Sequence, residues 1–101
     1  MEEYLGMIKQ FAGLRQDFLS NGFQDYLPCD GRLLNVSQYT ALFSILGNTY
    51  GGDGKTNFKL PDLRPKNEEG KVLPIKVGEI HNGVPYIPYY ICINGIYPST
   101  N

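Results

Sequence analysis

The sequence predicts an α+β fold, a small and mostly β domain in which one short helix at about residues 37–46 packs on a twisted, mainly antiparallel sheet. Three observations support this prediction. The chain has 101 residues, which is room for a single domain over residues 1–101. Its 12 glycines and 7 prolines favour many turns and short elements. Apolar residues recur at helical spacing most clearly in the stretch named, whereas other segments alternate as strands do.

We expect strands and turns in the chain before this helix. Residues 4–12 mix apolar and small side chains with partial alternation, which predicts a strand, and residues 14–19 predict one or two helical turns. The dipeptide Asp30-Gly31 stands between apolar flanks and favours a type I′ turn. This turn would join residues 26–29 and 32–36 in a tight hairpin.

The helix has a signal at each end. Ser37 is placed to act as its N-cap, because a serine hydroxyl accepts a hydrogen bond from a backbone N–H of the first turn. Gly47 is placed to end it in the left-handed αL conformation, which glycine adopts without steric cost. The apolar stripe between these residues predicts one face packed into the core, formed by Tyr39, Leu42, Phe43 and Leu46.

The glycine-rich loop at residues 51–58 resembles a phosphate cradle in part. Gly54-Lys55-Thr56 matches the end of the P-loop pattern, but that pattern requires a glycine where Thr49 stands. The loop also follows a helix and precedes an extended segment, which is the reverse of the order that aims backbone amides at phosphate. Asp53 lacks the spaced oxygen ligands of a calcium loop. We therefore expect this loop to serve the fold and to bind neither ligand.

After the loop, the chain predicts an edge strand or extended segment. Phe58 to Leu63 alternate in the way such a segment requires, with Pro61 stiffening its exit. Asp62 and Arg64 would turn to the other side, where they can pair with each other or with backbone groups.

Three signals remain towards the C-terminus. Residues 66–71 form a short mixed-charge run, which predicts a solvated turn. Residues 72–80 predict a strand that Pro74 interrupts, and Asn82-Gly83 predicts a hairpin turn. Residues 90–94 form a strongly β-favouring run. We expect it inside the sheet, because so apolar a strand at an exposed edge would promote aggregation.

The composition excludes several classes of partner. Nine basic and ten acidic residues give a net charge of -1, so the basic surface that nucleic-acid binding requires is missing. No apolar run approaches the roughly 18 residues of a membrane span, and the first residues are acidic where a signal peptide would be basic. Cys29 and Cys92 predict two buried thiols, with a disulfide between strands as the alternative. With one histidine in the chain, we expect neither a metal nor a cofactor.

Two strings of the chain carry a family resemblance, CDGRLL at 29–34 and SQYTALFSILGNTYGGDGKTNFKLPDLR at 37–64. They resemble the phage tail collar family, which includes domains of short tail fibres and the small microcystin-dependent proteins. The likeness extends upstream through YLGMIKQFAG and downstream to INGIYPSTN, about two thirds of the chain. So long a string is far more specific than a short motif. The positions that carry it specify the fold, namely Cys29, Asp30, Gly31, Ser37, Leu42, Phe43, Gly47, Gly51, Gly52, Gly54, Pro61, Asp62, Leu63 and Arg64.

The resemblance implies a non-enzymatic structural or adhesive component of a bacteriophage tail or tail-like particle, acting in host attachment or tail assembly. It implies a protein made in the bacterial cytoplasm and located in the virion. The implied partners are further copies of the chain in a homotrimer, other phage tail or baseplate proteins, and a host surface glycan or protein. So short a chain offers little surface for a deep pocket. We expect exposed tyrosines to stack on sugars or fill a subunit interface, namely Tyr50, Tyr86, Tyr89 and Tyr97.

Two segments depart from the family pattern. Residues 14–25 are longer than the usual link, and residues 65–90 replace a glycine-rich segment that ends in a His-x-His string. The metal that such histidines hold in trimeric fibres is therefore not expected here, and His81 is expected to be a solvated turn residue. We expect contacts with partners in these two departing segments.

Two other functions stay open. One is a carbohydrate-binding module outside a phage particle. The other is a small hydrolase that uses Asp30, Asp53 or Asp62 with His81. Aspartates in turns have a ready structural use, however, because their side chains hydrogen-bond to nearby backbone groups.

Overall fold

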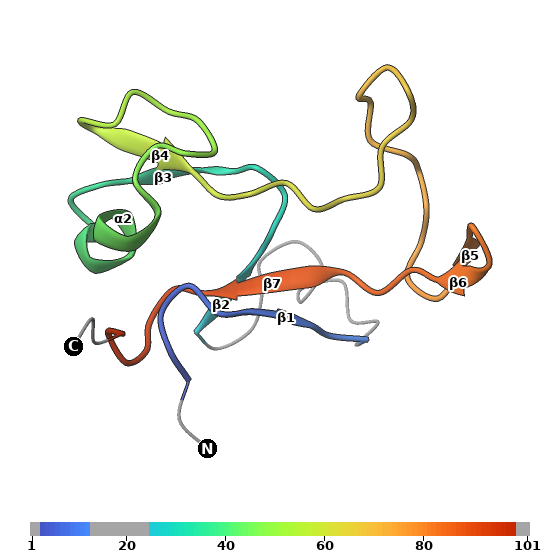
Figure 1. The fold of residues 1–101 in the computed structure, drawn as a ribbon, viewed down its shortest axis with the longest axis horizontal. Coiled ribbons are helices and arrows are strands. Elements are labelled where there is room, and N and C mark those ends of the chain that lie inside the picture. Colours follow the sequence, from blue (N-terminus) through green and yellow to red (C-terminus); the bar gives the residue numbers. More distant parts are fainter. Residues whose placement is uncertain (1–2, 13–24, 99–101) are drawn as a thin grey trace.

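A computed structural model describes residues 3–12 and 25–98 of the chain, apart from the side chain of His81 (Figure 1). It has mostly antiparallel sheets and one short helix, so the predicted α+β fold class is confirmed. The helical turns predicted at residues 14–19 lie outside the described residues.

The central strand of the largest sheet comes last in the chain. β7 (Tyr89–Cys92) lies between β1 (Ile8–Gln10) and β2 (Tyr26–Pro28) and is antiparallel to both. The prediction that the C-terminal β run lies inside the sheet is confirmed. The strand predicted at residues 4–12 is present over the three residues of β1 alone.

Both faces of β7 contribute to the core. Tyr90, Ile91 and Cys92 are each 0% exposed. Because successive strand residues point to opposite faces, Ile91 packs into one cluster while its two neighbours pack into another. The larger cluster contains Cys29, Leu34, Leu42, Phe58, Leu60 and Ile91, and the smaller one contains Tyr26, Tyr90 and Cys92.

The dipeptide Asp30-Gly31 does not close a hairpin, so that prediction is wrong. β2 pairs with β7, and β3 (Leu33–Asn35) pairs instead with β4 (Asn57–Lys59). The dipeptide carries the chain from one sheet to the other, and Gly31 has φ 75° there. Pairing β2 with β7 buries apolar side chains on both strands, and this gain outweighs the local preference for a tight turn.

The helix α2 (Thr40–Leu46) begins later than predicted. Ser37 is not its N-cap, because the N–H and hydroxyl of Ser37 both donate to the Asn35 Oδ1 atom, at 3.0 and 2.8 Å. Asn35 thus forms an Asx turn, a geometry that asparagine favours strongly, and this turn occupies the serine. Tyr39 stands at the N-cap and makes no side-chain capping bond.

The other helix predictions fare better. Leu42 is 1% exposed, and the Phe43 ring lies 5.3 Å from the Phe58 ring, so the apolar stripe packs as expected. Gly47 ends the helix with its N–H donating to the Phe43 carbonyl at 2.7 Å. Its φ of 59° is positive as predicted, but its ψ of -151° is not that of the αL region. This combination is almost restricted to glycine.

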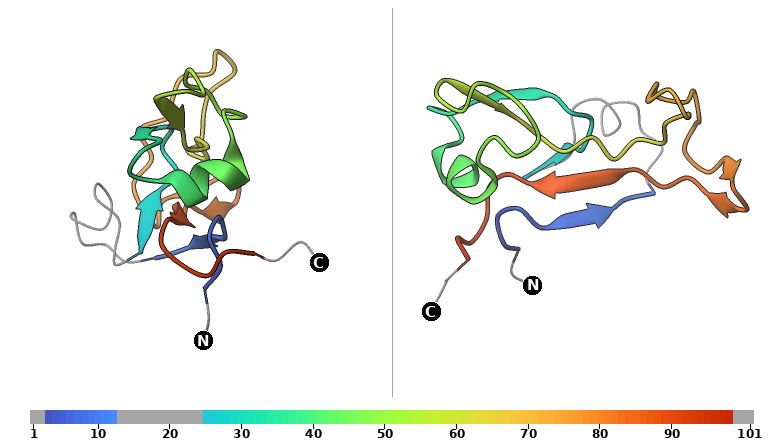
Figure 2. Two further views of the ribbon diagram at one scale, coloured as in Figure 1. Left: turned by 90° about the vertical axis from the view of Figure 1, so that its left-hand side faces the viewer. Right: turned by 45° about the horizontal axis from the view of Figure 1, so that its top comes forward.

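A small hairpin projects from the rest of the molecule. β5 (Ile80–His81) and β6 (Val84–Pro85) pair around Asn82-Gly83, whose φ values of 52° and 83° fit a type I′ turn. This prediction is confirmed. Figure 1 and the right-hand view of Figure 2 show the hairpin at one end of the molecule, on the opposite side from α2. The strand predicted at residues 72–80 is wrong over most of its length, since residues 72–79 form only an isolated bridge between Val72 and Lys66 and β5 begins at Ile80.

Candidate functional site

The described structure joins two Asp-x-Arg sequences into one polar frame. Asp30 and Asp62 face each other in an antiparallel bridge. The Arg32 guanidinium donates from Nε and Nη2 to the Asp30 carboxylate at 3.0 and 2.9 Å. The Arg64 guanidinium binds the Asp62 carboxylate in the same way, at 2.8 and 2.7 Å. Each charge is therefore neutralised by a partner two residues away, as the sequence predicted for the second pair.

The frame keeps Asp62 ionised. Hydrogen bonds from the Arg64 side chain hold the pKa of the Asp62 carboxyl well below its usual range, with weaker help from the Arg64 backbone N–H and from Lys66. The same pairing raises the pKa of Arg64. A carboxyl held ionised in this way is unsuited to act as a general acid or base near neutral pH.

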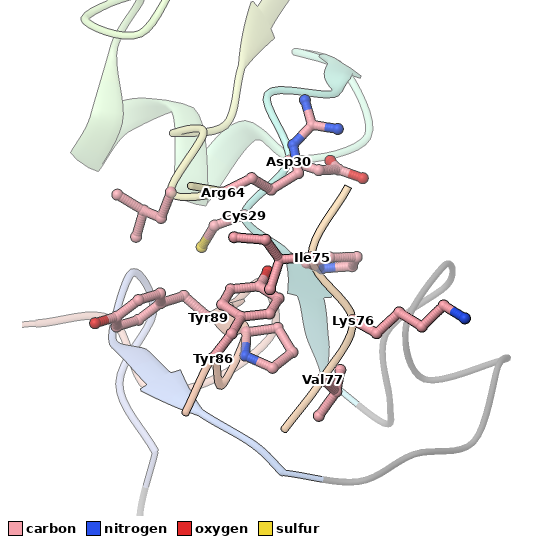
Figure 3. Close-up of a pocket in the computed structure, with 11 residues that line it drawn as sticks. Cys29, Asp30, Arg64, Ile75, Lys76, Val77, Tyr86 and Tyr89 are labelled. Atoms are coloured by element: carbon pink, nitrogen blue, oxygen red, sulfur yellow. The ribbon is translucent and has the colours of Figure 1, made fainter. Parts of the chain in front are cut away.

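A half-open cavity of about 570 Å³ lies beside this frame (Figure 3). Such a volume is within the range of small-molecule sites, roughly 300–1,000 Å³. The sequence led us to expect little surface for a deep pocket, and this cavity is half-open. One wall comes from residues 28–30 and 63–64, and the other from residues 75–77, 86 and 88–89.

Two tyrosines, Tyr86 and Tyr89, belong to the second wall. Tyr86 is half-buried, and desolvation raises the pKa of its phenol. Tyr89 is 38% exposed and lies on the central strand. A second cavity of about 230 Å³ shares both tyrosines and Leu63 and continues towards Val84 and Pro85. Tyr86 and Tyr89 thus line a groove made of two cavities that share both side chains.

Cys29 lines the cavity as an unreactive group. Its side chain is 3% exposed, and burial raises the pKa of the thiol to about 12, with the nearby Asp30 and Asp62 adding to the effect. A protonated thiol is a poor nucleophile and a poor metal ligand. Cys92 is likewise buried and unbonded, so the prediction of two buried thiols is confirmed and the disulfide is absent.

The four tyrosines predicted as contacts do not gather in one place. Tyr86 and Tyr89 line the cavity, whereas Tyr50 and Tyr97 lie elsewhere and are 48% and 53% exposed. The Tyr97 hydroxyl lies 2.7 Å from the Ser44 Oγ atom of α2.

Sequence reasoning missed five residues of the cavity, namely Pro28 on β2 and four in the opposite wall. Ile75, Lys76, Val77 and Pro88 belong to no motif. The one signal for them is that they fall within residues 65–90, the segment that departs from the family pattern.

The glycine-rich loop is held together by Asp53. Its carboxylate accepts hydrogen bonds from the N–H groups of Lys55, Thr56 and Asn57 at 2.8 to 3.0 Å, and from the Thr56 hydroxyl at 2.7 Å. These bonds hold the pKa of the Asp53 carboxyl well below its usual range. The loop amides are therefore occupied by the protein itself, which leaves them unable to cradle a phosphate.

The remaining fold-specifying positions have structural roles. Gly51, Gly52 and Gly54 all have positive φ, and a Cβ atom on Gly52 would lie 2.6 Å from the Phe58 Cα atom. Pro61 is buried, and its carbonyl accepts the Gly31 N–H at 3.3 Å. The three glycines shape the loop, and Pro61 supports the frame. None of these four residues lines the cavity.

Within residues 3–12 and 25–98, no group of three or more His, Cys, Asp or Glu side chains is arranged to hold a metal ion. The side chain of His81 lies outside the described part of the chain, so the proposed hydrolase pairing with an aspartate has no structural test. None of the helices in the described residues has the length and apolar character needed to cross a membrane.

Comparison with known proteins gives one match. The family model of the phage tail collar domain matches residues 6–67 of the sequence. No curated protein and no solved structure matches the chain significantly. The matched residues supply the frame and the first wall of the cavity, whereas the second wall lies beyond them.

Proposed function

The chain belongs to the phage tail collar domain family and is therefore a structural component of a phage tail, and from this premise we propose that it assembles with copies of itself and with neighbouring tail or baseplate proteins. In this proposal the protein is made in the bacterial cytoplasm, resides in the virion and catalyses no reaction.

One observation carries the proposal of assembly. Among the described residues, 13 large apolar side chains are exposed, whereas 10 apolar side chains are buried. Apolar side chains exposed singly are normal on a soluble monomer, but exposed apolar groups that lie together mark sites of interaction, and some of these side chains occur in neighbouring pairs. The radius of gyration, 14.4 Å, also exceeds the roughly 13 Å of a compact chain of this length. An open shape with much exposed apolar surface supports a protein that is buried among neighbours.

The exposed apolar side chains occur in more than one part of the molecule. Ile80 and Val84 on the projecting hairpin are 69% and 61% exposed. Away from the hairpin, Tyr4 and Ile96 pair in a bridge and remain 43% and 41% exposed. Contacts in two parts suit a subunit that joins one neighbour to another.

We propose a homotrimer as the assembled state. Size-exclusion chromatography with light scattering tests it, and the expected mass is three times the 11.4 kDa of one chain. A single 11.4 kDa species at micromolar concentration would contradict self-assembly. Pull-down with the tail and baseplate proteins of the same phage tests the contacts with other subunits.

A second function, host attachment, is favoured by the cavity beside Tyr86 and Tyr89. A half-open groove with two tyrosines suits a ligand from the host surface, either a glycan or a protein segment. The purified protein is then expected to compete with the phage for adsorption to its host. Undiminished adsorption at saturating protein would contradict this role and leave the assembly role intact.

A further inference from the structure

We infer that the groove beside Tyr86 and Tyr89 binds a neutral oligosaccharide. This inference rests on the host-attachment function proposed above and names the chemical class of the ligand. It follows from five features of the groove: an aromatic wall, a polar wall, the balance of charge, the pairing of its backbone, and the two cavities that share its tyrosines.

The aromatic wall suits a sugar ring. A pyranose has an apolar face of C–H groups and a rim of hydroxyls, and a tyrosine offers an apolar ring with a polar tip. Tyr86 and Tyr89 provide two such rings along the groove. Their hydroxyls have no hydrogen-bonding partner among the described residues, so both remain available to a ligand.

The polar wall offers donors and acceptors in fixed positions. Asp30 and Arg64 lie side by side at one end of the cavity (Figure 3). Asp30 uses three of its roughly four acceptor positions on Arg32, which leaves one for a ligand. Arg64 uses two of its five side-chain N–H groups on Asp62, which leaves three. Sugar hydroxyls both donate and accept, so they can use both groups.

The balance of charge disfavours an acidic ligand. Asp30 is neutralised by Arg32, and Arg64 is neutralised by Asp62. An anionic group would reach the three remaining N–H groups of a guanidinium whose charge Asp62 already balances in part. Lys76 is the remaining charged residue of the lining in the described chain, and its amine points away from Arg64 and Tyr86 (Figure 3). The lining therefore presents its charges in ion pairs, apart from Lys76.

The backbone of the groove disfavours an extended peptide. A peptide strand gains affinity by pairing its backbone with an unpaired strand edge. Here the backbone groups are largely used, since Cys29 N–H donates to Tyr89, Leu63 N–H donates to Cys29, and Tyr86 pairs in both directions with residues 78–79. Pro28 and Pro88 have no N–H to offer. Recognition must therefore come from side chains.

The two cavities fit a ligand of more than one ring. The cavities of about 570 and 230 Å³ share Leu63, Tyr86 and Tyr89. A short oligosaccharide can place one ring on each side of the tyrosines, whereas a single sugar would fill only one side.

Saturation-transfer NMR with matched sugars tests the inference. The probes are short oligomers of galactose, glucose and N-acetylglucosamine, together with the corresponding oligomers of galacturonic and glucuronic acid. Each acidic oligomer differs from its neutral counterpart by one carboxylate per ring, which replaces the hydroxymethyl group. We expect transfer to at least one neutral probe and weaker transfer to its acidic counterpart. Tighter binding of the acids, or no transfer to any neutral probe, would overturn the inference.

Two variants locate the site. Tyr86→Phe removes one hydroxyl and leaves the ring, and it should weaken binding of the neutral probe about tenfold, the usual effect of one lost hydrogen bond. Tyr89→Ala should abolish detectable binding. Tyr50→Phe and Tyr50→Ala are the matched controls, because Tyr50 is exposed but lies outside both cavities. Equal binding by the Tyr86 variant and its Tyr50 control would contradict the site.

The adsorption assay separates this inference from the function on which it rests. If the protein blocks phage adsorption but prefers acidic sugars, the ligand class is wrong and host attachment stands. If neutral sugars bind but adsorption is unaffected, the ligand class stands and host attachment is wrong.

Discussion

Asp30 and Asp62 face each other in an antiparallel bridge, and each carboxylate binds the arginine two residues further along the chain. The bridge holds the segment that contains Asp30 against the segment that contains Asp62. Two further backbone bonds flank it, from Gly31 N–H to the Pro61 carbonyl and from Leu63 N–H to the Cys29 carbonyl. These backbone contacts explain how two distant parts of the sequence form one wall of the groove.

Asp62→Asn should destabilise the fold by about 1–2 kcal/mol. The change removes the charge that binds Arg64 and Lys66, and hydrogen bonds to charged groups contribute about 1.5–3 kcal/mol before solvent screening reduces them. Urea unfolding followed by circular dichroism measures the loss. Glu69→Gln makes the same chemical change at an exposed position and should cost less than about 0.5 kcal/mol. Equal losses in both variants would contradict the role given to Asp62.

The contribution of Asp62 should depend on pH. Its folded-state pKa is lowered by Arg64, so its stabilisation is fully present above the unfolded-state pKa of about 3.9 and decreases as pH falls below that value. The difference in unfolding free energy between the wild type and Asp62→Asn should therefore be larger at about pH 7 than at about pH 3. A difference that stays constant would show that the lost interaction does not depend on the charge.

Local sequence signals predicted the helix and the Asn82-Gly83 hairpin, because these depend on residues close together in the chain. They failed at Asp30-Gly31, where the same kind of turn signal leads into two separate sheets. There, the pairing of β2 with a strand from the other end of the chain decides the structure. The prediction that Ser37 is the N-cap was also wrong, because the Ser37 N–H and hydroxyl donate to the Asn35 side chain instead. Long-range burial and competition between neighbouring caps are not visible in a short window of sequence.

Gly52→Ala should be strongly destabilising. A Cβ atom there would lie 2.6 Å from the Phe58 Cα atom and 2.9 Å from the Asn57 carbonyl oxygen, and φ is 93°. We expect a loss of more than about 2 kcal/mol from the clash and the backbone strain together. Gly47→Ala is the matched control, because φ is 59° but nothing lies within 4 Å. It should cost about 1 kcal/mol. Thermal unfolding of both variants provides the comparison, and a greater loss at Gly47 would contradict it.

Asp53→Ala should loosen the glycine-rich loop while the core stays folded. The carboxylate holds the amides of Lys55, Thr56 and Asn57, and the substitution removes all three acceptor contacts. Hydrogen exchange of these amides should accelerate, whereas exchange at Tyr90 and Ile91 should not change. Unchanged protection at residues 55–57 would show that the loop does not depend on Asp53.

Cys29 and Cys92 should resist thiol reagents in the native protein. Both thiols are buried, and burial raises the pKa of each, so little thiolate forms at about pH 8. Reaction with dithionitrobenzoate should be slow in buffer and should reach 2 thiols per chain in denaturant. Rapid labelling of the native protein would place one of the thiols at the surface.

The groove was harder to predict than the fold. The sequence identified Tyr86 and Tyr89 as candidate contacts and residues 65–90 as the departing segment, but it gave no sign that these residues close a cavity against Arg64. The cavity forms because the chain segment from Pro61 to Pro88 folds back towards the sheet. Only three-dimensional packing shows that Ile75 and Val77 lie opposite Cys29.

The central claim is that this chain is a structural subunit of a phage tail, surrounded by other copies and other tail proteins. A cryo-electron microscopy reconstruction of the tail from the phage that encodes it tests this claim most directly. We expect density for the β1-β7-β2 sheet in three symmetry-related copies, with Ile80 and Val84 covered by neighbouring protein. A well-resolved tail in which no density fits the chain would contradict the account.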